Sequence, residues 1–245
     1  MLESNLLLLE VTFLLLATLY SVTGHGGASG YIAIMALLGM APQEMKPIAL
    51  SLNIIVSLIA TIQFYGAGHF RRALFLPFAM GSVPLAMVGG YVQLPTHWFN
   101  ALMGMALIFA ALRIGIKPLR TITQNSPPLL PALAAGSAIG LLSGLIGVGG
   151  GIFLTPLLLL MGWANSRQAA AVSAPFILLN SISGLAGFNT QVSYSLPASM
   201  AWLVMAVLIG GLLGSFMGSR YLPMQVVSRF LSLVLLLAGF KLFYV

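Results

Sequence analysis

The sequence lacks cysteine and aspartate, and only 5% of its residues are charged. Without cysteine it has no disulfide framework, no thiol nucleophile and no cysteine-based metal site. Its only carboxylate side chains are Glu3, Glu10 and Glu44, and it has neither a P-loop nor a His-x-x-x-His pair. Because no set of nucleophile, base and acid is available, we expect no enzyme activity, no cofactor and no metal site.

The composition that remains is strongly apolar. Hydrophobic residues make up 60% of the chain and the mean hydropathy is +1.06, whereas a soluble domain carries roughly 25% charged residues. Because a spanning helix needs about 20 residues, the 245 residues allow at most about nine or ten crossings. The sequence therefore predicts an all-α integral membrane protein in a lipid bilayer, without room for a separate soluble domain.

The net charge of +7 arises from ten lysine and arginine residues against three acidic ones. In a membrane protein positive residues gather in cytoplasmic loops, so we expect no nucleic-acid partner. The stretch MLESNLLLLEVTFLLLATLY (1–20) has no basic region and carries Glu3 and Glu10. It is therefore expected to be a first membrane segment and not a cleaved signal peptide.

Apolar runs separated by charges, prolines and glycines predict ten helical segments, five on each side of the polar stretch KPLRTITQNSPP (117–128). The expected ranges are 4–23, 29–41, 47–66, 73–92, 97–116, 129–146, 151–163, 168–187, 197–217 and 225–244.

The two halves are predicted to be repeats. GHGGASGYIAIMALLGMA (24–41) aligns without a gap with GVGGGIFLTPLLLLMGWA (147–164), 123 positions later. Two shorter matches follow in the same order: GGYVQLP with MGSRYLP, and AALRI with AGFKL, the latter 128 positions apart. We expect a first membrane repeat at 1–116, a polar cytoplasmic linker over the stretch defined above, and a second membrane repeat at 129–245.

The second segment of each half has about 13 residues, or near 20 Å, which is shorter than the roughly 30 Å hydrocarbon core. The first two segments therefore either form one broken crossing or enter the membrane and return to the same side. If the segments return to the same side, eight of the ten lysines and arginines lie on one side of the membrane and two on the other. If they form one crossing, the numbers are six and four. The positive-inside rule favours the return to the same side, which predicts inverted repeats with both termini away from the cytoplasm. The larger group would then hold Arg71, Arg72, Arg113, Lys117, Arg120, Arg167, Arg220 and Arg229, and the smaller one Lys46 and Lys241.

Clustered glycines precede the short segment of each half. Glycine adopts positive φ without steric cost and can turn successive N–H groups toward one point, and the following helix adds the positive end of its dipole. Inverted-repeat transporters hold their substrate near the midplane at such broken helices. We therefore predict a substrate-binding site that includes Gly24, Gly26, Gly27, Gly147, Gly149, Gly150 and Gly151. The alternative is close helix packing, which we expect for Gly140–Gly144 and Gly210–Gly214.

Few polar side chains accompany these glycines. His25 is the only side chain of either cluster that changes charge near neutral pH, so it is either a functional ligand or a neutral donor to a carbonyl. Asn53 and Asn180 lie deep in corresponding segments, and Ser173 is a similar candidate. These three either line the site or join helices by hydrogen bonds. Glu10 lies within the first segment and is a candidate proton carrier.

The stretch GLLSGLIGVGGGIFLTPLLLLMGW (140–163) resembles the signature of the TauE/SafE sulfite exporter family. The match runs through the second glycine cluster, Pro156 and Gly162, whereas the first half departs from it at Ala28 and Ala33. The resemblance implies two homologous halves, each with a glycine-rich break before a short helix. It also implies a bacterial inner-membrane exporter of sulfite, sulfonates or related organosulfur anions.

We therefore predict an all-α integral membrane protein with two inverted repeats and short helices at the glycine motifs. A small anionic substrate would bind between the two breaks, and rocking of one half against the other would alternate its access. Either the proton gradient or the anion's own gradient would drive export. Two other hypotheses stay open: a membrane subunit whose glycines only pack helices, and a cation- or proton-coupled permease that depends on Glu10.

Overall fold

The computed structural model describes residues 6–114, 127–192, 194, 200–221 and 236. All regular elements in this part of the chain are helices, which confirms the predicted all-α class. The α-helices are α1 (Leu6–Val22), α2 (Ala28–Leu37), α3 (Pro42–Gly66), α4 (Arg72–Tyr91), α5 (Thr96–Ile114), α6 (Leu129–Ile146), α7 (Gly151–Leu160), α8 (Ser166–Asn189) and α9 (Ala201–Arg220). They match the expected segments in order, whereas the expected segment 225–244 falls outside the described residues except at 236.

The helix lengths separate spanning helices from short ones. Five helices, α3, α4, α6, α8 and α9, are long and apolar enough to cross a membrane. α2 and α7 have 10 residues each, or about 15 Å at 1.5 Å per residue, which is half of the roughly 30 Å hydrocarbon thickness. The prediction of short helices directly after the glycine clusters is therefore confirmed.

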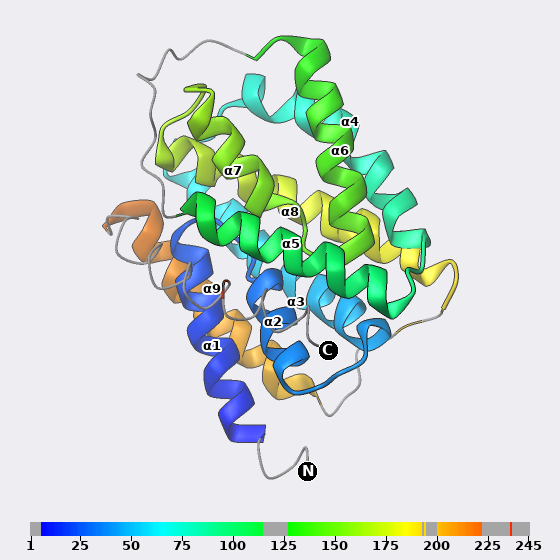
Figure 1. Cartoon of the computed structure of the whole chain (residues 1–245). Helices are drawn as coiled ribbons and strands as arrows, with labels where there is room; N and C mark the ends of the chain where they lie inside the picture. The colour runs from blue at the N-terminus through cyan, green and yellow to red at the C-terminus, as the bar shows by residue number, and fades with distance from the viewer. Residues whose placement is uncertain (1–5, 115–126, 193, 195–199, 222–235, 237–245) are drawn as a thin grey trace.

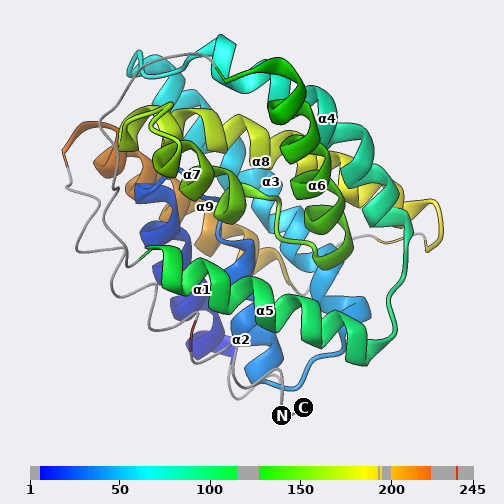
Figure 2. The same cartoon turned by 45° about the horizontal axis from the view of Figure 1, so that its top comes forward.

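The long helices form three neighbouring pairs. α3 and α8 lie at the centre, with α1 and α9 side by side on one flank and α4 and α6 on the other (Figure 1, Figure 2). α2 packs on α3 and α7 on α8, and α5 lies across the bundle against α3, α6 and α7 (Figure 2). Each flanking pair combines a helix from the first half of the chain with one from the second, so the two halves interlock.

Glycines bring both flanking pairs into backbone contact. Three glycines of α9 and three of α6 face the backbone of the partner helix. A Cβ at any of the six would lie 2.0–2.5 Å from a carbonyl oxygen of that helix, and a close-packed interface has no room for it. On α9 they are Gly210, Gly214 and Gly218, which face Leu14, Thr18 and Val22; on α6 they are Gly136, Gly140 and Gly144, which face Phe78, Ser82 and Ala86. The predicted packing role of Gly140–Gly144 and Gly210–Gly214 is confirmed. Because the contacts advance in the same direction on both helices, each flanking pair is parallel.

The central pair has the opposite relation. Lys46 near the start of α3 lies beside Phe188 near the end of α8, and Asn53 in the middle of α3 is hydrogen-bonded to Ser181 of α8. α3 and α8 are therefore antiparallel, as inverted repeats require of corresponding helices. The repeats and their boundaries at 1–116, 117–128 and 129–245 stay predictions.

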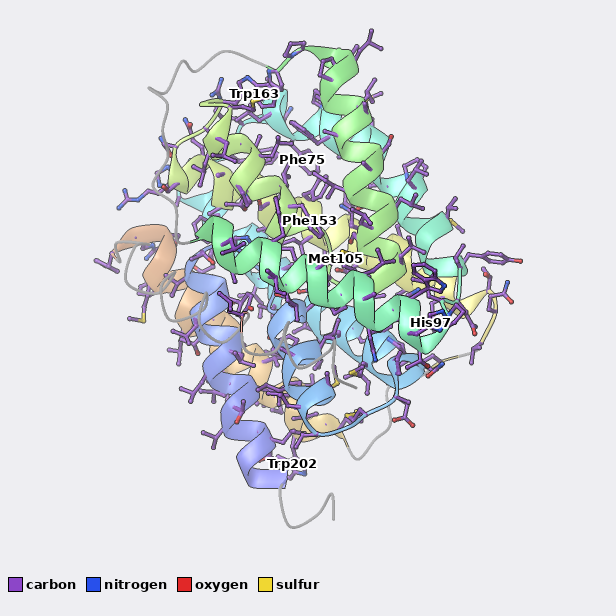
Figure 3. All side chains as sticks on the ribbon, in the orientation of Figure 1. Phe75, His97, Met105, Phe153, Trp163 and Trp202 are labelled. Atoms are coloured by element: carbon purple, nitrogen blue, oxygen red, sulfur yellow. The ribbon has the colours of Figure 1, made fainter. Side chains whose placement is uncertain are left out.

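Charged and aromatic residues mark the two ends of the bundle. The Arg71 guanidinium donates a hydrogen bond of 3.2 Å to the carbonyl of Trp163, shortly before α8 begins. Lys46 lies beside Phe188, near the other end of α8. Figure 3 shows Trp163 and Trp202 at opposite ends of the molecule. Tryptophan is enriched at both membrane–water interfaces, so its two positions fit helices that cross a bilayer.

Two glycines of α8 give a matched test of the packing. A Cβ at Gly187 would lie 2.1 Å from the Met87 carbonyl oxygen, whereas a Cβ at Gly184 meets nothing nearer than 3.7 Å. Gly187→Ala is expected to destabilise the chain by about 1–3 kcal/mol through overpacking, and Gly184→Ala to be neutral or stabilising because alanine is the better helix former. Thermal unfolding in detergent measures both variants. Equal midpoints would contradict the packing argument.

Candidate functional site

The two glycine breaks share positive φ at two equivalent positions and differ at a third, where Gly149 has φ 79° and Gly26 has no positive φ. Gly27 precedes α2 with φ 95° and Gly150 precedes α7 with φ 81°. Gly24 and Gly147, three residues earlier in each half, also have positive φ, 72° and 79°. Glycine adopts this left-handed region without steric cost, so both breaks turn at equivalent positions of the aligned stretches.

Both short helices begin with N–H groups that find few acceptors. The N–H of Ala28 donates to Asn53 Oδ1 over 3.3 Å. Within the described residues, the next N–H groups of α2, at Ser29 and Gly30, have no acceptor, and neither have those of Gly151 and Ile152 in α7. Such groups carry the positive end of the helix dipole, so each break presents donors and partial positive charge.

The side chain of Asn53 lies between the two breaks. While its Oδ1 accepts from α2, its Nδ2 donates to Ser181 Oγ over 2.9 Å. A Cβ at Gly26 would lie 1.8 Å from Asn53 Oδ1, and a Cβ at Gly149 would lie 2.4 Å from Asn53 Nδ2. Both glycines are therefore required for the buried carboxamide to reach this position in the middle of α3.

His25 joins the first break to the second. Its Nε2 lies 3.2 Å from the carbonyl oxygen of Gly151, and since a carbonyl only accepts, Nε2 carries the hydrogen in this contact. Its Nδ1 lies 2.9 Å from Thr23 Oγ1 and 3.1 Å from the Thr23 carbonyl oxygen. The Thr23 hydroxyl can donate either to Nδ1 or to the Tyr20 carbonyl oxygen, 2.8 Å away. Neutral and protonated imidazole both find partners here, so the two roles predicted for His25 stay open.

The remaining predicted residues lie at other helix contacts. Gly24 packs against Ala170 of α8, and Gly147 against Lys46 of α3. Ser173 Oγ lies 2.7 Å from the hydroxyl oxygen of Thr155, between α8 and α7. Asn180 makes two hydrogen bonds: it accepts from Ser82 Oγ of α4 and donates to the Phe176 carbonyl oxygen of its own helix. The structure thus brings His25, Gly26, Gly27, Asn53, Gly149, Gly150 and Gly151 together, and their substrate-binding role stays a prediction.

Sequence reasoning missed three hydroxyl groups at the breaks. Ser181 lies 128 positions after Asn53, the spacing that also relates AALRI to AGFKL, so a signal for it existed. The Tyr31 hydroxyl is buried without a hydrogen-bond partner, and a Cβ at Gly27 would lie 2.6 Å from it. Ser143 Oγ is likewise buried without a partner, and its Cβ lies beside Gly150. No periodic pattern distinguishes these two from core residues.

An unpaired hydroxyl beside each break calls for an explanation, because most buried polar groups are hydrogen-bonded. Together with the N–H groups of α2 and α7, these hydroxyls give the two breaks an excess of donors. No group of three or more histidine, cysteine or acidic residues that could hold a metal ion occurs among the described residues. The arrangement is chemically suited to a small anion that accepts several hydrogen bonds.

The chain matches the family model described as "Sulfite exporter TauE/SafE" over residues 10–242. It is 39% identical over 241 residues to "Probable membrane transporter protein y4hK" of Sinorhizobium fredii (strain NBRC 101917 / NGR234), with 96% of this chain and 97% of that protein covered. It is 25% identical over 278 residues to "Probable membrane transporter protein YunE" of Bacillus subtilis (strain 168), with 98% of each chain covered. No solved structure matches the chain.

Proposed function

The chain belongs to the sulfite exporter TauE/SafE family, and on that premise we propose that it exports sulfite, sulfonates or related organosulfur anions across the inner membrane. Family membership and the five spanning helices make it a multi-pass membrane transporter. Export of such an anion needs no catalytic step, cofactor or metal in the chain.

The observation that carries the proposal is the position of Asn53 Oδ1. This oxygen accepts the N–H of Ala28 at the start of α2, where an anion's oxygen would bind at a helix N-terminus. An entering anion would displace the carboxamide oxygen and accept from Ala28 together with Ser29 and Gly30. The unpaired hydroxyl of Tyr31 would add a donor at the same break.

The second break supplies donors from the other half of the chain. The N–H groups of Gly151 and Ile152 and the hydroxyl of Ser143 lack acceptors within the described residues. Glu10, the candidate proton carrier, lies in the first half of α1, and the first break follows the opposite end of that helix. The donor-rich site therefore favours an anion over a cation.

Alternating access would follow from the hydrogen bonds that join the two halves. His25 Nε2 to the Gly151 carbonyl and Asn53 Nδ2 to Ser181 Oγ both connect residues of different halves. If the anion replaced these hydrogen bonds with contacts to itself, the two breaks would no longer be held together. The antiparallel central pair of α3 and α8 lies between the two flanking pairs, so rocking of one flanking pair against the other would alternate access.

The direct test is flux through the purified protein in liposomes. We expect wild type to move sulfite and small sulfonates, and His25→Ala to lower the rate about tenfold, because the buried Gly151 carbonyl loses its donor. His97→Ala, at the exposed histidine labelled in Figure 3, is the matched control and should transport as wild type. Absence of flux of every such anion in wild type would overturn the proposed function and favour a packing subunit.

A further inference from the structure

Lys46 places a positive charge inside the bundle, at the end opposite to Arg71 and Arg167. Its side chain is 4% exposed. Its Nζ donates to three carbonyl oxygens at the end of α4, those of Gly89, Gly90 and Val92, over 3.2, 3.1 and 3.3 Å. The Phe188 ring centre lies 5.7 Å away. Helix C-terminal carbonyls and an aromatic face both attract a cation, so the ammonium is held in one place.

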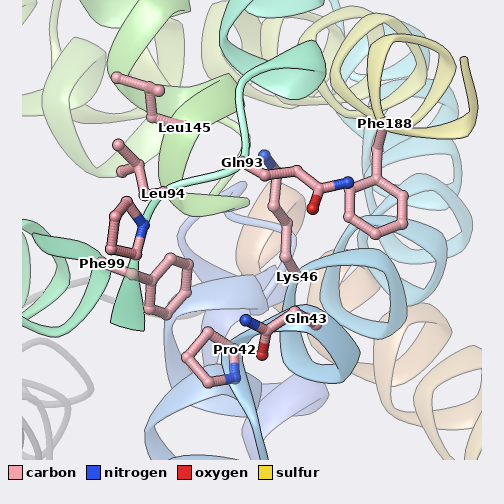
Figure 4. Close-up of a pocket in the computed structure, with 9 residues that line it drawn as sticks. Pro42, Gln43, Lys46, Gln93, Leu94, Phe99, Leu145 and Phe188 are labelled. Atoms are coloured by element: carbon pink, nitrogen blue, oxygen red, sulfur yellow. The ribbon is translucent and has the colours of Figure 1, made fainter. Parts of the chain in front are cut away.

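This ammonium lies at a pocket of about 210 Å³ (Figure 4). Gln43 and Gln93 line the pocket with carboxamides, and Phe99 and Phe188 line it with aromatic rings. Both glutamines are exposed. A water molecule takes roughly 30 Å³ in the liquid, so the pocket has room for a small oxyanion with part of its hydration shell.

The charge of Lys46 has no carboxylate partner within ion-pair distance among the described residues; its partners are carbonyl dipoles. A buried charge without a counter-charge is costly. An anion in the pocket would supply the missing charge, and lysine acts toward anions as a point charge that needs no fixed geometry.

Lys46 also contacts the second break. A Cβ at Gly147 would lie 3.0 Å from Lys46 Cγ and 3.3 Å from its Cα. At the equivalent glycine of the first break, Gly24, the neighbour is the uncharged Ala170. A lysine therefore lies beside Gly147 but not beside the equivalent Gly24. This lysine is at the end of the bundle where α4, α6 and α8 end.

We propose that the Lys46 pocket is a second anion-binding site, through which the transported oxyanion passes on the non-cytoplasmic side of the glycine breaks. The carboxamides of Gln43 and Gln93 donate to the anion's oxygens. The ammonium of Lys46, which is held by the α4 carbonyls, attracts the anion by its charge. The identity of the anion and the side of the membrane rest on the proposed function, whereas binding in the pocket does not.

The test is equilibrium binding of sulfite to the purified full chain in detergent, with ionic strength held constant by chloride. It uses an Asn53→Asp background, in which a carboxylate occupies the central site. Binding is expected to persist there, and Lys46→Gln to raise the apparent Kd about tenfold. Lys46→Arg keeps the charge and should stay within about threefold of the background value. Gln93→Ala, at an exposed position, should weaken binding several-fold and leave the α4 carbonyl contacts intact.

The matched control is Arg72→Gln, which removes an exposed positive charge at the other end of the bundle and should leave the Kd unchanged. Loss of sulfite binding in Asn53→Asp, an unchanged Kd in Lys46→Gln, or equal losses in Lys46→Gln and Lys46→Arg would each overturn the second site. Lys46-dependent binding in a chain that shows no flux in liposomes would support the pocket and overturn the proposed function instead.

Discussion

Gly26→Ala is expected to reduce anion transport strongly. The new Cβ would lie 1.8 Å from Asn53 Oδ1 and 2.6 Å from Asn53 Cγ, so the carboxamide must leave the space between the breaks. Its hydrogen bonds to Ala28 and Ser181 are then lost together. Gly26 does not adopt a positive φ, so alanine fits the backbone there and the expected defect is steric.

Liposome flux at equal protein content measures this effect, with Gly66→Ala as the control. A Cβ at Gly66, the last residue of α3, meets nothing within 4 Å, so that variant should transport as wild type. Adding Asn53→Ala to Gly26→Ala removes the clash and should restore the thermal midpoint. Flux within about twofold of wild type in Gly26→Ala would show that the buried carboxamide is dispensable, because a clash this close forces it to move.

Asn53→Asp is expected to reduce transport to background. The carboxylate keeps the shape of the side chain and still accepts the N–H of Ala28, and in its ionised form it places a negative charge where the substrate's oxygen would bind. Two like charges about 4 Å apart repel by about 4 kcal/mol at the effective dielectric constant of protein sites. At about 1.4 kcal/mol per factor of ten, substrate binding should weaken by roughly three orders of magnitude.

The comparison with Asn53→Ala separates charge from shape. Asn53→Ala loses both hydrogen bonds of the carboxamide, and it leaves the N–H groups of α2 uncovered with no charge beside them. We expect flux to fall in the order wild type, Asn53→Ala, Asn53→Asp, with thermal midpoints as the check on folding. If Asn53→Asp transports as fast as Asn53→Ala, no anion binds at the start of α2.

The turns at the breaks could be predicted from the sequence because they depend on local properties. Gly24, Gly27, Gly147 and Gly150 all have positive φ, and the freedom to adopt it belongs to glycine itself. The order of the helices was predictable for a similar reason, whereas several ends were not: α3 begins at Pro42 and not at 47, and α7 ends at Leu160 and not at 163. The family resemblance rested on the same stretch, and the match over residues 10–242 confirmed it.

Partners across the site were harder to predict. Asn53 and Asn180 seemed equivalent by their depth in corresponding segments, but Asn180 is bonded to Ser82 of α4 and the neighbouring Ser181 is bonded to Asn53 of α3. Successive residues of a helix point about 100° apart. The choice between them therefore depends on how α8 is rotated between α3 and α4, which no single helix encodes.

By itself, then, the sequence determined that the chain lies in a membrane, that it is helical, that two glycine-rich turns precede short helices, and which family it belongs to. These properties depend on composition and on glycine conformation, which act locally. Only the tertiary structure decided that Asn53 lies between the breaks, that His25 meets the Gly151 carbonyl, and that a lysine without a carboxylate partner among the described residues lies at a pocket. The first two contacts join residues 128 and 126 positions apart. They exist only after the two halves pack against each other, and it is that packing which turns two glycine-rich turns into one candidate anion site.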